Sequence, residues 1–286
     1  KIITLWNTYS FFITYANLDG FDPQLDYVDD SSRMNKLDRW ILARTYQFTS
    51  NAFNYYESFE VFKLMKDSET LIDDLSNWYI RRNRRRFWRS ENDIDKKAAY
   101  STLYTVLLQY TKVMAPIVPF ITEEIFQNLS FDSSIEKSVH LENFPSYEID
   151  NVQESLIDEI DSLISIVSLG RSARNKANIK IRQPLSEVVV CCDKRIGKIA
   201  TDNEQEILEE LNIKKMKLIS NKDELVSFNV KPNFQSLSQK VGQHMKEVVK
   251  FINSIEKDKL LDCNSHKIVY SCEGFELRIM YDDLII

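Results

Sequence analysis

Residues 74–89 read DLSNWYIRRNRRRFWR, and this stretch decides how the rest of the chain is interpreted. Six of its residues are arginines and no acid follows Asp74, although the whole chain has a formal net charge of −6. Four aromatic residues stand among or beside the arginines: Trp78, Tyr79, Phe87 and Trp88. Positive charge concentrated beside aromatic rings in an acidic chain predicts a local site for phosphates and bases.

The residues before this stretch predict a helix that runs into it. A mainly apolar stripe recurs at helical spacing and consists of Val61, Leu64, Met65, Ser68, Leu71, Leu75 and Trp78. At 100° per residue, Arg82 and Arg89 continue that apolar face and Arg86 lies on its shoulder. A second stripe lies about 100° round the helix and consists of Arg81, Arg84, Arg85 and Trp88. We expect the second stripe to face RNA and Arg82 to reach a buried carboxylate.

The alternative for such a charge run is a solvated helix end, where the helix dipole favours cations. Six arginines without an intervening acid repel one another unless an anion neutralises them. This repulsion favours the anion-binding interpretation for residues 81–89.

A second basic segment, residues 170–184, reads GRSARNKANIKIRQP and follows a predicted helix from Val152 to Val167. It contains five cations and no acid: Arg171, Arg174, Lys176, Lys180 and Arg182. RNA contact and an exposed helix end followed by a loop remain equal alternatives for this segment.

Composition predicts a mainly α fold, since the 286 residues include only 5 glycines and 6 prolines. Helical spacing predicts helices over residues 1–18, 37–55, 61–89, 93–114 and 122–129, which form an antiparallel bundle. After the long helix 152–167, strands are expected at 188–192, 216–219, 268–271 and 275–280, with helices at 207–211 and 237–252. The predicted domains are a helical bundle, residues 1–145, and a smaller α+β domain with its leading helix, residues 146–286.

Several classes of site and location are disfavoured by the sequence. Cysteines 191, 192, 263 and 272 do not match a zinc pattern with the three histidines, so no metal site is predicted. No glycine-rich phosphate loop or nucleophile constellation occurs either, so no catalytic residue is predicted. No apolar stretch is long enough for a membrane span, so we expect a cytoplasmic protein without membrane contact. The halves divided at Ser146 carry −3 each, which argues against a general DNA binder. The sequence starts at Lys1 and not at a methionine, and the residues that follow are already apolar, so we expect a piece of a longer chain.

Residues 75–88 closely resemble the anticodon-binding region of isoleucyl-tRNA synthetases, which are class I aminoacyl-tRNA synthetases. Five further stretches resemble that family in the same order: 6–12 with 15–21 (WNTYSFF and YANLDGF), 37–42 (LDRWIL), 114–120 (MAPIVPF), 170–184 and 231–234 (KPNF). Valyl and leucyl enzymes share the bundle and the Ala-Pro segment, whereas the arginine-rich run and residues 176–184 favour isoleucine. The α+β region is similar to that of the longer branch of the family.

The resemblance implies that the parent enzyme attaches isoleucine to its tRNA with ATP and Mg²⁺. The ATP-holding signatures His-Ile-Gly-His and Lys-Met-Ser-Lys-Ser do not occur here, and the editing domain is missing. We therefore expect this chain to be inactive alone and to need no cofactor. Its expected partners are the tRNA for isoleucine and the N-terminal catalytic and editing domains of the same parent chain.

By this resemblance, Arg81, Arg84 and Arg85 meet phosphates of the anticodon arm, and Trp88 or Tyr79 stacks on an unpaired base. The complete set of expected tRNA-binding residues is Tyr79, Arg81, Arg84, Arg85, Arg86, Trp88, Arg171, Arg174, Lys176, Lys180 and Arg182. The competing hypothesis is a helical protein-interaction scaffold whose two basic segments dock on acidic surfaces of partners or neighbouring domains.

Overall fold

The computed structural model describes residues 1–88, 93–130, 138–146, 152–220, 231–255, 268–272 and 275–285. Arg89 and Cys263 lie outside this description. The chain forms two compact units, one of residues 1–184 and 199–212, the other of residues 185–198 and 213–286. A mainly α fold with a smaller α+β part is confirmed.

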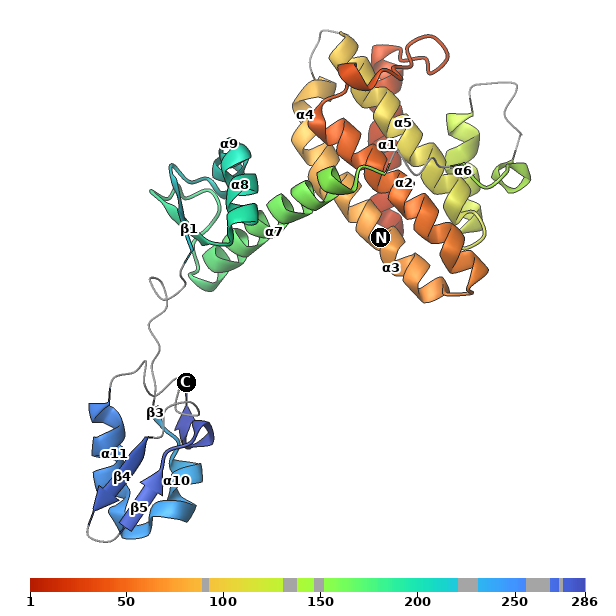
Figure 1. The fold of residues 1–286 in the computed structure, drawn as a ribbon. Helices are drawn as coiled ribbons and strands as arrows, with labels where there is room; N and C mark the ends of the chain where they lie inside the picture. The colour runs from red at the N-terminus through yellow and green to blue at the C-terminus, as the bar shows by residue number, and fades with distance from the viewer. Residues whose placement is uncertain are drawn as a thin grey trace. The chain divides into compact units, whose positions relative to one another are not determined.

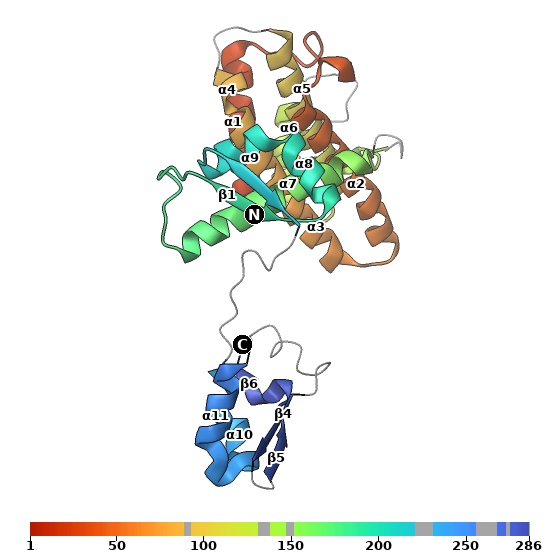
Figure 2. The same ribbon diagram turned by 60° about the vertical axis from the view of Figure 1, so that its left-hand side comes forward.

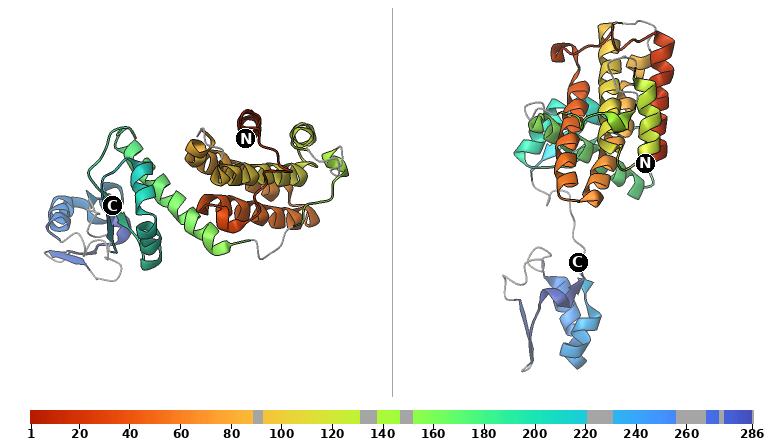
Figure 3. Two further views of the ribbon diagram at one scale, coloured as in Figure 1. Left: turned by 90° about the horizontal axis from the view of Figure 1, so that it is seen from above. Right: turned by 90° about the vertical axis from the view of Figure 1, so that its right-hand side faces the viewer.

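The first unit is a bundle of helices that run beside one another (Figure 1; Figure 3). Its helices are α1 (Ile2–Asp19), α2 (Lys36–Glu57), α3 (Val61–Asp73), the π-helix η2 (Asp74–Ile80), α4 (Arg81–Trp88), α5 (Ile94–Met114), α6 (Pro119–Leu129), α7 (Glu154–Lys176) and α9 (Glu204–Leu211), with 3₁₀ turns η1 (Ser31–Arg33) and η3 (Val139–Leu141). Helix α5 packs against α1, α2, α4 and α6. Its fully buried Leu103, Val106 and Leu107 contribute to the core of this bundle.

Local sequence signals explain where several helices begin and end. Asn35 and Asp38 form a reciprocal capping box at the start of α2. The Asp93 carboxylate accepts the Lys96 N–H at the start of α5, 2.9 Å away. Gly20 ends α1 in the left-handed conformation, with φ of 65°. These caps set the residues at which the helices begin and end.

The π-helix η2 changes which side of α4 faces the core. A π-turn contains more residues than an α-turn, so the residues that follow are rotated relative to a continuous α-helix. The sequence places Arg82 on the buried face, but the buried side chains after Trp78 are Tyr79, Ile80, Asn83, Arg86 and Phe87. The apolar face is therefore displaced by about one residue from the position that 100° spacing predicts.

Helix α7 belongs to the first unit, so the units separate near residue 184 and not at the expected residue 145. It packs against α2 and α9, and Ile160 and Leu163 are fully buried. Lys36 on α2 donates to Glu159 on α7, with Nζ–Oε1 at 2.6 Å. The helix that was expected to lead the α+β domain instead completes the helical core together with α9.

The second unit contains short strands and helices. Strand β1 (Val188–Cys191) pairs in parallel with β2 (Met216–Ile219). Helix α8 (Lys194–Asp202) follows β1, and its residues from 199 onward belong to the first unit. Near the C-terminus, β3 (Lys231–Pro232) pairs antiparallel with β6 (Leu284–Ile285), and β4 (Val269–Cys272) with β5 (Phe275–Arg278). The expected strands are confirmed within one or two residues.

The C-terminal elements share a small core. Helices α10 (Phe234–Val241) and α11 (Met245–Ser254) lie beside β4 and β5 (Figure 2), and the 3₁₀ turn η7 (Tyr281–Asp283) precedes β6. The buried cluster consists of Leu237, Val241, Val248, Ile252, Leu277, Ile279 and Leu284. The single helix expected over 237–252 is wrong: Gly242, with φ of 51°, begins a 3₁₀ turn, η6 (Gly242–His244), between α10 and α11.

Candidate nucleic-acid interface

The outer face of α4 carries the part of the arginine run that is open to solvent. Arg84, Arg85 and Trp88 are exposed, and Trp88 keeps 56% of its surface accessible. The Arg84 guanidinium lies 5.9 Å from the centre of the Trp88 ring. This geometry can present two cations to phosphates and one aromatic face to a base. RNA contact by these three residues remains a prediction.

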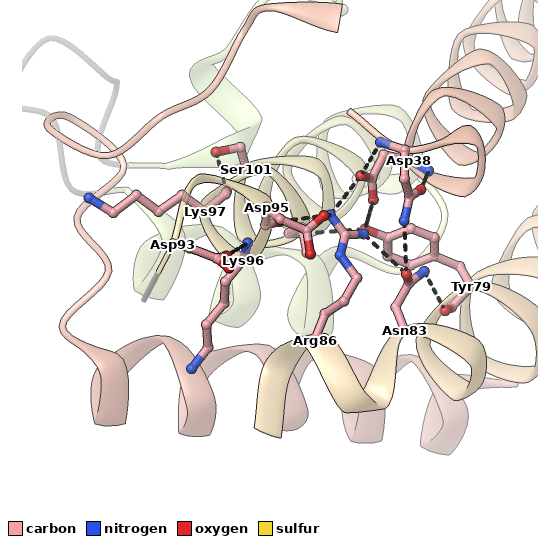
Figure 4. Close-up of polar contacts among 11 residues, drawn as sticks. Asp38, Tyr79, Asn83, Arg86, Asp93, Asp95, Lys96, Lys97 and Ser101 are labelled. Carbon is pink, nitrogen blue, oxygen red and sulfur yellow. Dashed lines mark hydrogen bonds and ion pairs between the residues drawn. The ribbon is translucent and has the colours of Figure 1, made fainter. Parts of the chain in front are cut away.

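Arg86, expected at the interface, is instead buried, and that assignment is wrong. Its Nη1 and Nη2 donate to Oδ1 and Oδ2 of Asp38 at 2.8 and 2.9 Å, and Asp38 has no exposed surface (Figure 4). Nη2 also donates to the backbone carbonyl of Asp95 at 2.7 Å. Burial alone would lower the pKa of Arg86, but the hydrogen bonds and charge of Asp38 raise it above its ordinary value. Arg86 therefore ties α4 to α2 and to the start of α5.

Tyr79 belongs to the same buried cluster and cannot stack on a base from this position. Its side chain has no exposed surface, and its hydroxyl donates to Oδ1 of Asp38 at 2.7 Å (Figure 4). Burial, followed by the charge of Asp38, raises the pKa of Tyr79 well above its ordinary value. Both errors have one cause, since the π-helix turns Tyr79 and Arg86 toward Asp38.

Arg81 and Arg82 are partly covered by glutamates of α9. Arg81 Nη2 lies 2.8 Å from Oε2 of Glu210, and Arg82 Nη2 lies 3.1 Å from Oε2 of Glu206. Both guanidinium groups also lie over the Trp78 ring, 5.7 and 5.1 Å from its centre. Arg82 thus reaches a carboxylate, but Glu206 is 32% exposed and not buried as expected. The sequence offered no local signal for the partners, which are more than a hundred residues away.

Three arginines and three glutamates line one pocket of about 200 Å³ between α4 and α9. Its residues are Arg81, Arg82, Arg85, Glu206, Glu209 and Glu210. Within it, the glutamates occupy positions beside the guanidinium groups that an external anion would otherwise take. Only part of the first arginine cluster is therefore free for an external polyanion.

The second basic segment is divided in the same way. Arg174 is 4% exposed and donates to the backbone carbonyls of Lys180, Gln183 and Asn212 at 3.2, 3.0 and 3.1 Å, so its assignment to RNA is wrong. It holds the loop after α7 against the end of α9. The remaining expected cations, Lys176, Lys180 and Arg182, are exposed.

Glu210 joins the two basic segments at one point. Its Oε2 accepts from Arg81 at 2.8 Å and from Arg171 at 2.5 Å, and its own side chain is only 10% exposed. The sequence predicted two separate cationic segments, and the structure brings one arginine of each to a single carboxylate. Together, the predicted cations with accessible side chains are Arg81, Arg84, Arg85, Arg171, Lys176, Lys180 and Arg182.

Among the described residues, no group of three or more His, Cys, Asp or Glu side chains has the arrangement of a metal site. No helix in the described part of the chain is both long and apolar enough to cross a membrane. The side chains of the interface offer guanidinium and ammonium groups, an exposed indole and neighbouring carboxylates.

Comparison with known proteins identifies the family to which this part of the chain belongs. Residues 38–190, which include α4 and both basic segments, match the family model described as the anticodon-binding domain of tRNA ligase. The chain is 40% identical over 288 residues to the isoleucine–tRNA ligase of Clostridium acetobutylicum, covering 99% of this chain and 27% of that protein. It is 42% identical over 281 residues to the ligase of the same name from Clostridium novyi, covering 96% and 26%.

The corresponding ligase of Treponema denticola is 37% identical over 299 residues, covering all of this chain and 27% of the relative. The chain spans about a quarter of the length of these curated relatives. The resemblance to isoleucyl-tRNA synthetases is confirmed by these matches. On the strength of the family match over residues 38–190, the chain belongs to the anticodon-binding domain family of tRNA ligases.

Proposed function

We propose that this chain binds the anticodon arm of the tRNA for isoleucine, as the anticodon-binding segment of an isoleucine–tRNA ligase. The observation that supports this most is the exposed face of α4, which carries Arg84, Arg85 and Trp88. In the described part of the chain, no carboxylate is seen within hydrogen-bonding distance of these side chains. Guanidinium groups suit phosphates because they present a fork of donors to the oxygens. An exposed indole suits the face of an unpaired base.

The remaining accessible cations extend this proposed contact. Arg81 and Arg171 meet at Glu210, and Lys176, Lys180 and Arg182 continue beyond Arg171 along the chain. Contacts to phosphates set the position of an RNA, whereas contacts to bases set the choice of sequence. We assign the arginines and lysines to positioning and Trp88 to stacking.

The proposed parent protein attaches isoleucine to tRNA with ATP and Mg²⁺, and its catalytic and editing domains are partners of this segment. The segment itself positions the tRNA and performs no amino acid activation. We place the parent protein in the cytoplasm, where it supplies aminoacylated tRNA for translation.

A filter-binding measurement tests the proposal with isoleucine tRNA and a non-cognate tRNA of similar length. We expect tighter binding of isoleucine tRNA, and weaker binding of both after Arg84→Ala with Arg85→Ala. The matched control is Lys63→Ala with Lys66→Ala, which removes the same charge from exposed positions on α3. Equal affinities for wild type and the arginine variant would contradict the proposal.

A second candidate is the protein-interaction scaffold. The observation that favours it is the pairing of Arg81 and Arg82 with Glu210 and Glu206, because it shows that these arginines accept an acidic helix as a partner. That candidate predicts no discrimination between the two tRNAs and retention of an acidic protein partner at the α4 face. The same filter-binding experiment separates the two functions.

A further inference from the structure

One face of helix α9 presents glutamates to the arginines of α4. Glu206 and Glu209 line the pocket of about 200 Å³ between the two helices, together with Glu210. The opposite wall of this pocket consists of Arg81, Arg82 and Arg85. Arg84 and Trp88, which carry the proposed RNA contact, lie outside the pocket wall. The arginine run is therefore divided into a part that faces acid and a part that faces solvent.

Arg82 would make this pocket attractive to anions if the glutamates carried no charge. Its side chain is 14% exposed, and its Nη1 is buried without a hydrogen-bond partner in the described part of the chain. Its Nη2 lies 3.1 Å from Oε2 of Glu206. Guanidinium groups bind phosphate oxygens through several N–H donors. Three such groups around one pocket would attract a phosphate from any RNA, because phosphate contacts do not depend on sequence.

The glutamates are held in place because the other side of α9 is buried. Ile207 and Leu211 have no exposed surface. Leu211 packs so closely on Gly170 of α7 that a Cβ atom at Gly170 would lie 2.5 Å from its Cδ1. Helix α9 cannot move away from α4 without exposing these two apolar side chains, which is unfavourable in water.

Both ends of α9 are also tied to the first unit. At its start, the Asn203 side chain accepts from Lys36 Nζ at 2.8 Å and donates to Glu159 Oε1 at 3.1 Å. At its end, the backbone carbonyl of Asn212 accepts from Arg174 Nη2 at 3.1 Å. The carboxylates are therefore fixed neighbours of the pocket, and a phosphate that enters it meets their negative charge. Like charges placed together are unfavourable in a complex.

We propose that Glu206 and Glu209 are specificity-determining residues that keep RNA phosphates out of this pocket. Binding that ignores RNA sequence is the sum of all positions in which phosphates meet cations. The two glutamates remove one group of such positions and leave the face of Arg84 and Arg85 open. This is discrimination by repulsion of the wrong arrangement. The inference rests on the proposed RNA-binding function.

The proposal predicts different effects on two kinds of RNA when the glutamates are neutralised. A cognate RNA binds chiefly in one position, so additional weak positions add little to its affinity. A non-cognate RNA binds only in weak, sequence-independent positions, so each new position adds a large share to its affinity. Neutral residues at 206 and 209 should therefore reduce discrimination and not simply strengthen binding.

The test measures filter binding of the whole chain to isoleucine tRNA, to a non-cognate tRNA of similar length and to inorganic polyphosphate. The variant is Glu206→Gln with Glu209→Gln, which removes two charges and keeps the side-chain shape. The matched control is Glu57→Gln with Glu69→Gln, which removes the same charge from exposed positions on α2 and α3, outside the pocket. Thermal unfolding checks that each variant is folded.

We expect the Glu206 and Glu209 variant to bind non-cognate tRNA about fivefold more tightly, which corresponds to about 1 kcal/mol. Isoleucine tRNA should gain by a smaller factor, so that the ratio of the two affinities falls. Polyphosphate, which carries charge but no bases, should also bind more tightly. The control variant should leave the ratio of the two tRNA affinities unchanged.

An equal gain for both tRNAs, or no gain for the non-cognate tRNA, would overturn the specificity role. The same fall in the ratio for the control variant would overturn it too, because net charge would then be the cause. If the double variant does not fold, Glu209→Gln alone decides the question, since Glu209 is exposed and should change binding in the same direction.

These outcomes also separate the specificity role from the proposed function. Preferential binding of isoleucine tRNA that depends on Arg84 and Arg85 but ignores the Glu206 and Glu209 changes refutes only the specificity role. A wild-type chain that binds neither tRNA refutes the proposed function. The polyphosphate measurement then still tests whether the two glutamates exclude phosphates from the pocket.

Discussion

Arg86 and Asp38 form a doubly hydrogen-bonded ion pair in the interior, with nitrogen–oxygen distances of 2.8 and 2.9 Å. Asp38 also accepts the hydroxyl of Tyr79, and Asn83 accepts from Arg86 Nη1 at 3.1 Å. The pair crosses from α4 to α2, so an arginine within a run of apparent surface cations is part of the core.

Breaking this pair should destabilise the fold. Arg86→Met leaves the Asp38 charge buried without its partner, which costs about 3–5 kcal/mol. Urea unfolding monitored by circular dichroism measures the loss. Arg85→Ala, at an exposed position one residue earlier, should change the free energy of unfolding by less than about 0.5 kcal/mol. A small effect of Arg86→Met, comparable to that of Arg85→Ala, would contradict the structural role of Arg86.

The π-helix should tolerate a deletion that an α-helix does not. Removing Ser76 from η2 lets the wide turn close to an ordinary α-turn, so that the faces of α3 and α4 keep their orientation. Removing Gln47 from α2 has no wide turn to absorb it, and it rotates Phe48 and Ala52 away from the core. Thermal unfolding should show a much larger loss for the Gln47 deletion. Equal losses would show that η2 is not a relaxed insertion.

The helices were predictable because their apolar residues repeat at helical spacing over many turns, as in α2 and α5. The orientation of α4 was not, since the rule of 100° per residue holds only while every turn is an α-turn. Nothing in residues 74–80 announces the wide turn, so the sequence does not predict that Tyr79 and Arg86 both face Asp38.

The sequence predicted only the part of the candidate site that follows from the local concentration of charged residues. The exposed Arg84, Arg85 and Trp88 follow from the arginine run itself. Arg174 differs because its partners are backbone carbonyls, which any sequence supplies and no pattern reveals. Glu210 was missed because its role depends on a contact between α4 and α9, which only the tertiary fold brings together.

Glu210 should compete with RNA for Arg81 and Arg171. Glu210→Gln removes the negative charge while keeping the shape, so both arginines become available to phosphates. Pairs at this level of exposure contribute up to about 1 kcal/mol, which corresponds to at most about fivefold tighter RNA binding. Fluorescence anisotropy with a labelled anticodon-arm hairpin measures the change.

The control for that change is Glu209→Gln. Glu209 lines the same pocket and accepts from Gln205 at 2.7 Å, and no hydrogen bond from an arginine to it is seen in the described structure. It should alter RNA affinity less than Glu210→Gln. Weaker binding by Glu210→Gln than by wild type would instead mean that Glu210 orients the two arginines for their ligand.

Asp74 should give the fold a pH-dependent stability. Burial raises its pKa from 3.8 to about 6, against the opposing effect of Arg44, and Asp161 and Asp73 add to the rise. The folded state therefore holds a proton that the unfolded state releases between about pH 4 and 6, so stability falls as pH rises through this window. The contribution is on the order of 2–3 kcal/mol.

Urea unfolding of wild type and Asp74→Asn at about pH 4.5 and pH 7.5 tests this contribution. The asparagine variant should gain stability relative to wild type at the higher pH, because it has no carboxyl group to ionise. A stability difference between the two proteins that stays constant with pH would show that Asp74 ionises normally in the fold.

The salt dependence of isoleucine tRNA binding tests the central claim most directly. Log affinity should fall linearly with log salt concentration between about 50 and 200 mM, and each phosphate contact contributes a slope of about 0.7–0.9. Replacing Arg84 and Arg85 together with alanine should make the slope shallower by about 1.4–1.8, with unchanged thermal unfolding. An unchanged slope in that folded variant would contradict the assignment of the α4 face to the RNA backbone.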